Sequence, residues 1–149
     1  MSVGQICNRQ VVVTSKDSSI FEVAKLMRDH HVGDVIVVDS SGVQPVPIGI
    51  ITDRDIVVEL IAKEVALDSV TVADVMSYDL FTAREQDGIW STLECMRVRG
   101  IRRMPVVNEQ GGLEGILTVD DLLELFSEEL TSLAKVAIRE QNREKEARE

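Results

Sequence analysis

The stretch GIITDRD at residues 49–55 decides the fold, because it returns 66 residues later as GILTVDD at residues 115–121. Upstream of these segments the two halves of the chain align at a shift of 69 residues, which places Met27 on Met96. The shift changes because the loop at residues 40–47 is longer than its counterpart in the second half. The chain is therefore a tandem repeat with about 60 residues in each copy.

Each copy has the same predicted order of elements: an extended piece, a helix, two strands and a closing helix. The extended pieces are expected at residues 11–13 and 80–82. The first helix is predicted by apolar residues at helical spacing, which are Ile20, Val23, Ala24 and Met27, and by a capping box formed by Ser19 and Glu22. Strands are predicted at residues 35–38, 48–51, 104–107 and 113–117. One repeat alone would bury too little surface, so we expect an α+β fold in which two β-α-β-β-α repeats pack with pseudo-twofold symmetry.

The predicted domain organisation follows from this repeat. Residues 1–62 form the first repeat, residues 63–71 connect the copies, and residues 72–127 form the second repeat. Residues 128–149 continue the last helix as a tail whose end is solvated. An apolar stripe runs along this helix through Leu122, Phe126, Leu130, Leu133 and Ala137. The stripe fits either a helix that covers the chain's own sheet or a dimer contact, since it is too short to demonstrate a coiled coil.

Composition and charge exclude several classes of protein. The 149 residues carry 16 basic and 26 acidic side chains, and the resulting charge of −10 disfavours binding to nucleic acid. The sequence lacks a long apolar run that could cross a membrane and lacks a signal peptide, so we expect a cytoplasmic protein. Two cysteines are too few for a disulfide framework or a structural zinc site. Aromatic residues make up 3% of the chain, so a flat ligand would be held between aliphatic side chains.

The two strand-to-helix junctions carry the candidate chemistry. In each, a threonine stands at the start of the helix and an aspartate follows three residues later, as Thr52 with Asp55 and Thr118 with Asp121. The simplest interpretation of either pair alone is a capping box with Asp in place of Glu. A helix start also favours phosphate, and a carboxylate one turn into the helix can accept both hydroxyls of a ribose. Recurrence of the pair at the same place in both repeats favours the ligand-binding interpretation.

A basic cluster precedes the first long strand of the second repeat. It consists of Arg97, Arg99, Arg102 and Arg103. It is either a solvated face or, for Arg102 and Arg103, a pair of phosphate ligands. The aligned residues in the first repeat are Gly33 and Asp34, which cannot hold phosphate. We therefore expect two unequal sites, of which the second-repeat site is the better anion binder.

Three other features indicate structural roles or no catalysis. Trp90 aligns with Phe21, so we interpret it as a packing position. The adjacent His30 and His31 do not share a helix face and are expected at a polar helix end. The sequence contains no recognisable nucleophile with a partner base, so we expect that the protein is not an enzyme.

The two copies resemble a cystathionine-β-synthase (CBS) domain pair, often called a Bateman module. The resemblance rests on the segments at residues 27–39 and 49–55, on their second copies at residues 96–108 and 115–121, and on Val75-Met76-Ser77 as the opening of a repeat. It covers about residues 3–127. It implies a module that binds adenosine-containing ligands in clefts between the repeats, with AMP, ADP, ATP, S-adenosylmethionine and NAD as candidates and no required cofactor or metal. It also implies a homodimer of stacked flat discs.

The resemblance also implies roles for individual residues. Asp55 and Asp121 would hold ribose hydroxyls, and Thr52 and Thr118 would contact phosphate or ribose. The basic residues Arg102 and Arg103 would contact phosphate, and Arg54 would add a contact in the first repeat. The adenine would meet the backbone around four positions, which are Thr14, Val35, Ala83 and Met104. The departure from the pattern is Gly33-Asp34, which points to a neutral ligand, a longer ligand or an empty cleft in the first repeat.

Three hypotheses about function follow. The leading one is a regulatory module that senses adenine nucleotides and acts on an unidentified protein target or on its own dimer interface, without contact with nucleic acid or membrane. The second is a dimerisation scaffold in which the Thr-x-x-Asp motifs are only helix caps. The third is an enzyme that uses Cys95 or His31. Thermal shifts with adenine nucleotides separate the first two, and product analysis with ATP and Mg²⁺ tests the third.

Overall fold

The computed structural model describes residues 1–148, so the last residue of the predicted tail, Glu149, lies outside the described part of the chain. The described chain divides into two compact units, of which the first spans residues 1–117 and the second begins at Thr118. The first unit holds nearly all of the two repeats. The second unit consists of Thr118 and the last helix.

The first repeat contains the predicted order of elements. They are β1 (Val13–Thr14), α2 (Ile20–His30), β2 (Asp34–Asp39), β3 (Val46–Thr52), α3 (Asp53–Asp55) and a π-helix at Ile56–Ile61. Helix α2 begins at the predicted capping box, in which the Glu22 amide donates to Ser19 Oγ at 3.1 Å and the Ser19 amide donates to Glu22 Oε2 at 3.0 Å. The closing helix begins after Thr52 as expected. Its change from α to π geometry beyond Asp55 was not predicted from the periodicity.

The second repeat has the same order of elements, β4 (Ala83–Arg84), α5 (Ile89–Arg99), β5 (Arg103–Val107), β6 (Leu113–Thr118) and α6 (Val119–Arg148). Each repeat is preceded by a short helix, α1 (Val3–Ile6) or α4 (Val72–Val75), and a 3₁₀ turn at Leu67–Ser69 lies in the connector. The short strands β1 and β4 begin two to three residues later than expected at residues 11–13 and 80–82. Strand β1 pairs with Ile36 and Val37 in the middle of β2, and β4 pairs with the last two residues of β5, so neither pairs with the start of the next strand.

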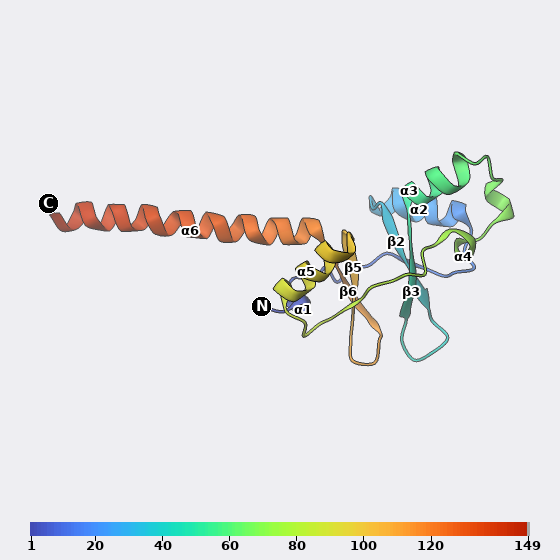
Figure 1. Ribbon diagram of the computed structural model, residues 1–149, viewed down its shortest axis with the longest axis horizontal. Coiled ribbons are helices and arrows are strands. Elements are labelled where there is room, and N and C mark those ends of the chain that lie inside the picture. The colour runs from blue at the N-terminus through green and yellow to red at the C-terminus, as the bar shows by residue number, and fades with distance from the viewer. Residues whose placement is uncertain (149) are drawn as a thin grey trace. The chain divides into compact units, whose positions relative to one another are not determined.

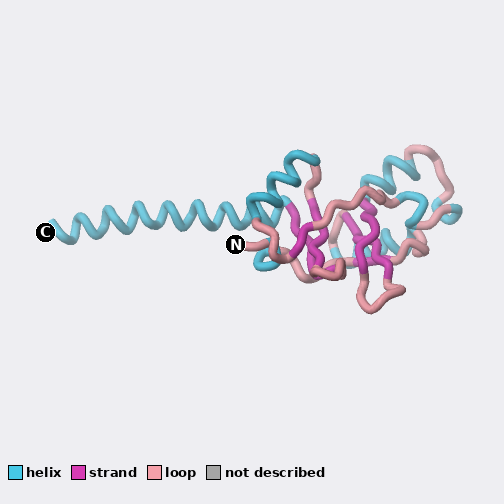
Figure 2. The backbone as a smooth tube through the Cα atoms, turned by 60° about the horizontal axis from the view of Figure 1, so that its bottom comes forward, coloured by secondary structure: helices cyan, strands magenta, loops and turns pink. Residues whose placement is uncertain are grey.

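The strands form two separate three-stranded sheets in the orders β1-β2-β3 and β4-β5-β6 (Figure 2). In the first sheet β1 runs parallel to β2, with Thr14 opposite Val37. Strand β3 runs antiparallel to β2, with Thr52 opposite Asp34. The second sheet repeats the first pairing, since β4 is parallel to β5. This register places the end of β3, with its Thr-x-x-Asp motif, beside the start of β2.

The repeats exchange their opening helices. The amides of Val3 and Gly4 in α1 donate to the carbonyls of Asp87 and Glu85 in the second repeat, both at 2.9 Å. Equivalently, α4 donates to the first repeat, and its Val72 is buried in the same core cluster as α2 and β2. Figure 1 shows the blue N-terminal helix α1 near β6 and α5, and the green α4 near β3. The two repeats therefore fold as one body rather than as two independent domains.

The repeated glycines of the GIxT motif permit this exchange. A Cβ at Gly49 would lie 2.7 Å from the carbonyl oxygen of Ser77, which belongs to the segment after α4. A Cβ at Gly115 would lie 2.8 Å from Cys7 Sγ and 2.9 Å from the carbonyl oxygen of Asn8, in the segment after α1. The backbones meet at both places through reciprocal hydrogen bonds, between Ile50 and Ser77 and between Asn8 and Ile116. The glycines are thus required by close packing of the exchanged segments.

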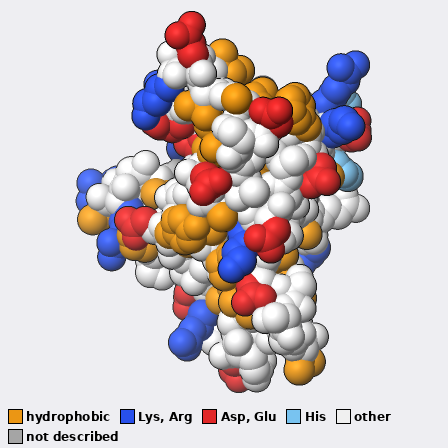
Figure 3. Space-filling model, turned by 90° about the vertical axis from the view of Figure 1, so that its right-hand side faces the viewer, with side chains coloured by type: hydrophobic (Ala, Val, Ile, Leu, Met, Phe, Trp, Pro, Cys, Tyr) orange, Lys and Arg blue, Asp and Glu red, His pale blue; other side chains and the backbone are white. Residues whose placement is uncertain are grey.

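The core is aliphatic, as the composition predicts. In α2 the side chains of Ile20, Val23 and Met27 are buried, as predicted. Ala24 was predicted to belong to the same stripe but is exposed. Phe21 and Trp90 are 53% and 73% exposed, so the interpretation of Trp90 as a packing position is not supported by burial in the core. Both residues follow the first buried position of their helix, α2 or α5, and a step of about 100° turns them away from the core. Apolar patches lie among scattered charged side chains on the face shown in Figure 3.

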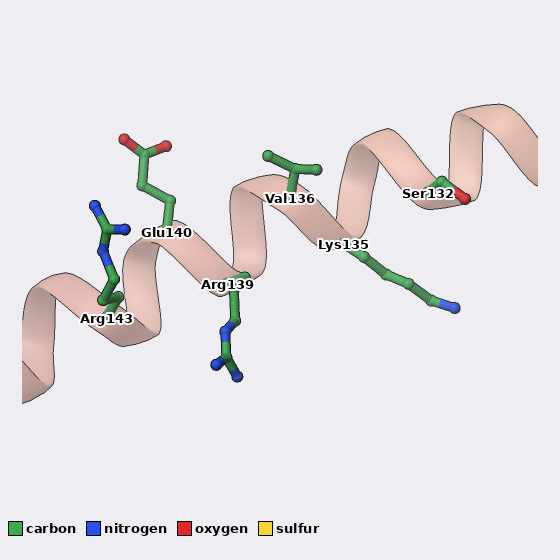
Figure 4. A pocket seen from close by; sticks show the side chains of 6 residues that line it. All are labelled: Ser132, Lys135, Val136, Arg139, Glu140 and Arg143. Atoms are coloured by element: carbon green, nitrogen blue, oxygen red, sulfur yellow. The ribbon is translucent and has the colours of Figure 1, made fainter.

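Helix α6 is a single helix of 30 residues in the second unit. Leu122 is buried, whereas Leu130 and Leu133 are each 66% exposed. Figure 4 shows the side chains along residues 132–143 projecting from the helix in different directions. Among residues 1–148, neither α6 nor any shorter helix carries an apolar stretch of the length that crossing a bilayer requires.

Candidate functional site

The motif at the end of β3 is a complete capping box. The Thr52 amide donates to Asp55 Oδ2 at 2.8 Å, and the Asp55 amide donates to Thr52 Oγ1 at 3.1 Å. Both residues are half-buried. Arg54 lies between them on the helix, exposed, with its amide bonded to Asp53 Oδ1 at 2.8 Å. The interpretation of this motif as a capping box is therefore confirmed.

The motif at the end of β6 has the same geometry. The Thr118 amide and hydroxyl both donate to Asp121 Oδ2 at 2.7 Å, and the Asp121 amide donates to Thr118 Oγ1 at 3.2 Å. These bonds use only one oxygen of the carboxylate. An ionised carboxylate has about four lone-pair positions, so each capping aspartate retains acceptor capacity at Oδ1. Capping and ribose binding are therefore compatible roles for Asp55 and for Asp121.

A hollow of about 470 Å³ lies between the segment before β1 and the end of α2. We call it the Val12 hollow; it is lined by Asn8, Gln10, Val11, Val12, Val13, Leu26, His30 and Val32. Val32 connects it to the motif, because the carbonyl of the next residue, Gly33, accepts a hydrogen bond from the Asp53 amide at 2.9 Å. The lining combines five aliphatic side chains with the polar Asn8, Gln10 and His30. The volume lies within the usual range for small-molecule sites. The sequence signal for it was the apolar run at residues 11–13, which we assigned only to an extended piece.

The sheet register separates Thr14 from the first motif. Thr14 lies opposite Val37, whereas Thr52 lies opposite Asp34. Three residues of strand correspond to about 10 Å. Thr14 lines a different hollow of about 370 Å³, together with Lys16, Asp39 and other residues. Of the two backbone positions expected near adenine in this repeat, buried Val35 adjoins Thr52 through the register and Thr14 does not.

The same separation holds in the second sheet. Ala83 is buried opposite Val106, three residues beyond Arg103, whereas buried Met104 directly follows Arg103 at the start of β5. Val12, whose carbonyl accepts from the Ile36 amide at 3.0 Å, lies closer to the start of β2 than Thr14 does. The residues before β1 therefore lie closer than Thr14 to the start of β2. The distance of Thr14 and Ala83 from the strand starts has the same origin as the late start of β1 and β4, because these short strands pair beyond the start of the next strand.

The basic cluster divides into residues with different roles. Arg97 donates to both carboxylate oxygens of Glu94, one turn earlier on α5. Arg99 lies over the ring of Phe81, with its guanidinium carbon 4.1 Å from the ring centroid. Arg102 is exposed. The four arginines therefore do not act as one anion site, and only Arg102 and Arg103 remain candidates for phosphate.

Arg103 contacts the equivalent residue of the other repeat. Its Nε lies 2.9 Å from Asp34 Oδ1, and the two side chains are 33% and 15% exposed. This Nε is buried, but its N–H is not aligned with the carboxylate as a hydrogen bond. Arg103 and Asp34 start β5 and β2, so the contact joins the two sheets at their pseudosymmetric strand starts. The sequence predicted that Asp34 could not hold phosphate, but not that it would pair with the arginine.

The ionised form of the Asp34 carboxyl is disfavoured by its surroundings. Burial raises the pKa of its carboxyl, the positive charge of Arg103 offsets part of this rise, and the nearby carboxylate of Asp53 adds to it. Asp53 Oδ2 also approaches Gly33, at 3.2 Å from the position of a Cβ there. Asp34, Asp53 and Asp55 therefore make the first-repeat side acidic, with Arg103 as the cation in contact with Asp34.

The two residues proposed for catalysis in the enzyme hypothesis, His31 and Cys95, lie at the end of α2 and on α5. His31 adopts a left-handed conformation (φ 54°) and ends α2, where its amide bonds to the Met27 carbonyl. The equivalent position in the second repeat is Gly100, also left-handed (φ 66°). Cys95 is half-buried on α5. Within residues 1–148, no cluster of three His, Cys, Asp or Glu side chains is arranged to hold a metal ion.

Comparison with known proteins agrees with this architecture. The model of a family described as "CBS domain" matches residues 3–62 and again residues 72–128. An uncharacterised protein of Methanopyrus kandleri, MK0525, is 35% identical over 125 residues. The alignment covers 84% of this chain and 62% of that protein. The chain therefore spans about three-fifths of the length of this relative.

Two solved structures share the fold and hold adenosine compounds. The CBS domain pair of protein MJ0100, in complex with 5′-methylthioadenosine and S-adenosyl-L-methionine, is 28% identical with a TM-score of 0.72. The alignment covers 87% of this chain and 98% of that one. The CBS domain protein PAE2072 from Pyrobaculum aerophilum, complexed with AMP, is 26% identical with a TM-score of 0.72, covering 85% and 99%.

Proposed function

Because this chain belongs to the CBS-domain family, we propose that it is a regulatory module that binds adenosine-containing ligands and catalyses no reaction. The observation that carries the proposal is the Val12 hollow together with the Thr52–Asp55 capping box, which are linked by the hydrogen bond from the Asp53 amide to the Gly33 carbonyl. The hollow suits a flat base between aliphatic side chains, and Asp55 Oδ1 suits the ribose hydroxyls. The complexes of MJ0100 and PAE2072 with adenosine compounds support this choice of ligand class.

We assign the ligand contacts residue by residue. Asp55 and Asp121 bind ribose, and Thr52 and Thr118 add contacts to ribose or phosphate. Val35 and Met104 offer backbone groups to adenine, and Val12 takes the role expected of Thr14. Arg102 and Arg103 bind phosphate. The second set therefore suits AMP, ADP or ATP, with NAD as a longer alternative.

The charge of the first-repeat side selects a different ligand. Asp34, Asp53 and Asp55 repel a phosphate, and Gly33 and Asp34 stand where the second repeat has Arg102 and Arg103. An uncharged adenosine compound, or one with a sulfonium cation such as S-adenosylmethionine, avoids this repulsion. We therefore infer that the first repeat prefers neutral or cationic adenosine compounds and that anionic nucleotides bind through Arg102 and Arg103.

The experiment compares two aspartates that cap helices in the same way. Asp74 caps α4 by accepting from the Thr71 amide at 2.9 Å, which matches the 2.8 Å bond from Thr52 to Asp55. Asp55→Ala and Asp121→Ala should lower ligand affinity strongly, whereas Asp74→Ala should lower only stability. In wild type, a ligand at 100 times its Kd adds about 2.7 kcal/mol of stability, which appears as a thermal shift of several degrees.

The alternative functions make opposite predictions in the same assay. If the module is only a dimerisation scaffold, no adenosine compound shifts the melting temperature and all three aspartate variants behave alike. If the chain is an enzyme that uses Cys95 or His31, ATP with Mg²⁺ is converted to a product that chromatography detects. Either result would replace the sensor proposal.

We also propose that the module forms a homodimer through the exposed apolar residues of α2 and α5. Phe21 and Trp90 occupy equivalent positions on these helices and are 53% and 73% exposed. Large exposed aromatic side chains are typical of interaction surfaces. Phe21→Ser should weaken this association in sedimentation analysis. A ligand could alter the interface or an unidentified protein target only if it binds one arrangement more tightly than the other.

A further inference from the structure

Helix α6 leaves an apolar stripe exposed to solvent. Leu123, Leu130 and Leu133 are 60%, 66% and 66% exposed, and half-buried Phe126 and exposed Ala137 complete the stripe. The five residues follow spacings of three and four alternately, which places them within about 80° of one helix face. This is the seam of two coiled-coil heptads. It has no cover among residues 1–148 at its three leucines.

The charges of α6 are separated along its length. Residues 119–132 carry five acidic side chains and no basic one. Residues 133–148 carry five basic and three acidic side chains, which gives +2. Lys135, Arg139 and Arg143 form no ion pair with any described residue, although Arg148 pairs with Glu144. The acidic half of one helix is therefore complementary to the basic half of an antiparallel copy.

The side-chain sizes select the same orientation. In an antiparallel pair centred between Thr131 and Ser132, Leu130 faces Leu133 of the copy, and Phe126 faces Ala137. This register thus pairs the bulkiest residue of the seam with the smallest one and matches Leu130 with Leu133, while Leu123 lies opposite Glu140. A parallel pair would instead stack Phe126 on Phe126 and Ala137 on Ala137, and would set the acidic halves against each other.

We propose that α6 is a self-association helix that pairs antiparallel with α6 of a second copy of this chain. The contact is isologous, so the same stripe serves both copies. Two heptads make a short seam, and pairing therefore depends on protein concentration. This inference does not rest on the proposed ligand function, because no adenosine-binding residue lies on the stripe.

Distance measurements between spin labels test both the pairing and its direction. The full chain, with Cys7→Ala and Cys95→Ala, would carry a single label through Ser132→Cys or Glu146→Cys. Labels at residue 132 lie near the centre and should be within about 25 Å of each other. In the antiparallel pair the two residues 146 are separated along the helix axis by the length of 29 residues. At a rise of 1.5 Å per residue, labels at residue 146 should be about 45 Å apart. In a parallel pair they would be as close as the central labels.

A matched pair of variants identifies the seam. Leu130→Glu with Leu133→Glu should abolish the short distance at residue 132. Ile138→Glu changes an equally apolar residue of α6 that is 58% exposed but about 100° from the seam, and it should leave the distance unchanged. The proposal is overturned by the absence of a short distance at residue 132. Equal distances at residues 132 and 146, or a loss of pairing in Ile138→Glu alone, would also overturn it.

Discussion

Asp34→Asn isolates the charge that competes for Arg103. The change keeps the size of the side chain and removes the carboxylate that lies 2.9 Å from Arg103 Nε. In wild type, a phosphate that binds Arg103 must displace this carboxylate. In the variant the guanidinium is free to bind the anion. We therefore expect tighter binding of AMP and no change for adenosine, which has no phosphate.

The geometry sets the size of the effect. The ion pair is partly exposed and its Nε–H is poorly aligned, so it belongs with pairs worth up to about 1 kcal/mol rather than with fully buried ones. Removal of the competitor should then tighten AMP binding by about fivefold, since about 1.4 kcal/mol corresponds to tenfold. The gain should shrink at high salt, because ions screen partly exposed charges.

Titration calorimetry with AMP and adenosine measures the effect directly. Arg103→Gln is the matched control, because it removes the cation and should weaken AMP but not adenosine. A tighter affinity of Asp34→Asn for both ligands alike would refute the reasoning, as would weaker binding of AMP. Failure of every adenosine compound to bind either protein would instead reject the proposed function.

Further predictions concern pH, packing and the caps. The pKa of Asp34 is raised in the fold, so keeping the carboxyl ionised lowers the stability of the folded state at neutral pH. This loss of stability disappears as the pH falls through the raised pKa towards the unfolded value of about 3.9. Melting curves should therefore show that the stability advantage of Asp34→Asn over wild type shrinks on acidification. Gly49→Ala and Gly115→Ala should each destabilise the fold by about 1–3 kcal/mol through overpacking, whereas Gly42→Ala, with open space around its Cβ, should be neutral in urea unfolding. Asp74→Ala should lower the melting temperature without lowering ligand affinity, and equal loss of affinity in Asp74→Ala and Asp55→Ala would contradict the ribose role of Asp55.

The sequence predicted the features that recur at a fixed spacing. Self-similarity revealed the two repeats, and the Thr-x-x-Asp spacing located both capping boxes, which the structure confirms. Features that depend on contacts between the copies were not predicted. The exchange of α1 and α4 is one such feature, although the glycine retained at the start of both GIxT motifs was a signal of close packing.

The exposure of apolar residues was the least predictable property. Helical spacing places Ile20, Val23 and Met27 on one face, but it does not say whether a neighbouring residue such as Phe21 meets a partner or solvent. The same limit applies to Trp90 and to the stripe on α6. Periodicity identifies a face, whereas burial depends on what the rest of the chain brings against that face.

The Arg103–Asp34 contact shows what the repeat alignment can reveal when it is combined with symmetry. Pseudo-twofold packing brings equivalent positions of the two copies together, so residues that align with each other near the axis are candidates for direct contact. Two arginines at these positions would repel each other, and so would two aspartates. Opposite charges at these positions attract each other, but they also give the two repeats different charges at equivalent positions. A second copy of the arginine that we propose as a phosphate ligand is therefore incompatible with this contact, and the module is expected to respond differently to anionic and uncharged adenosine compounds.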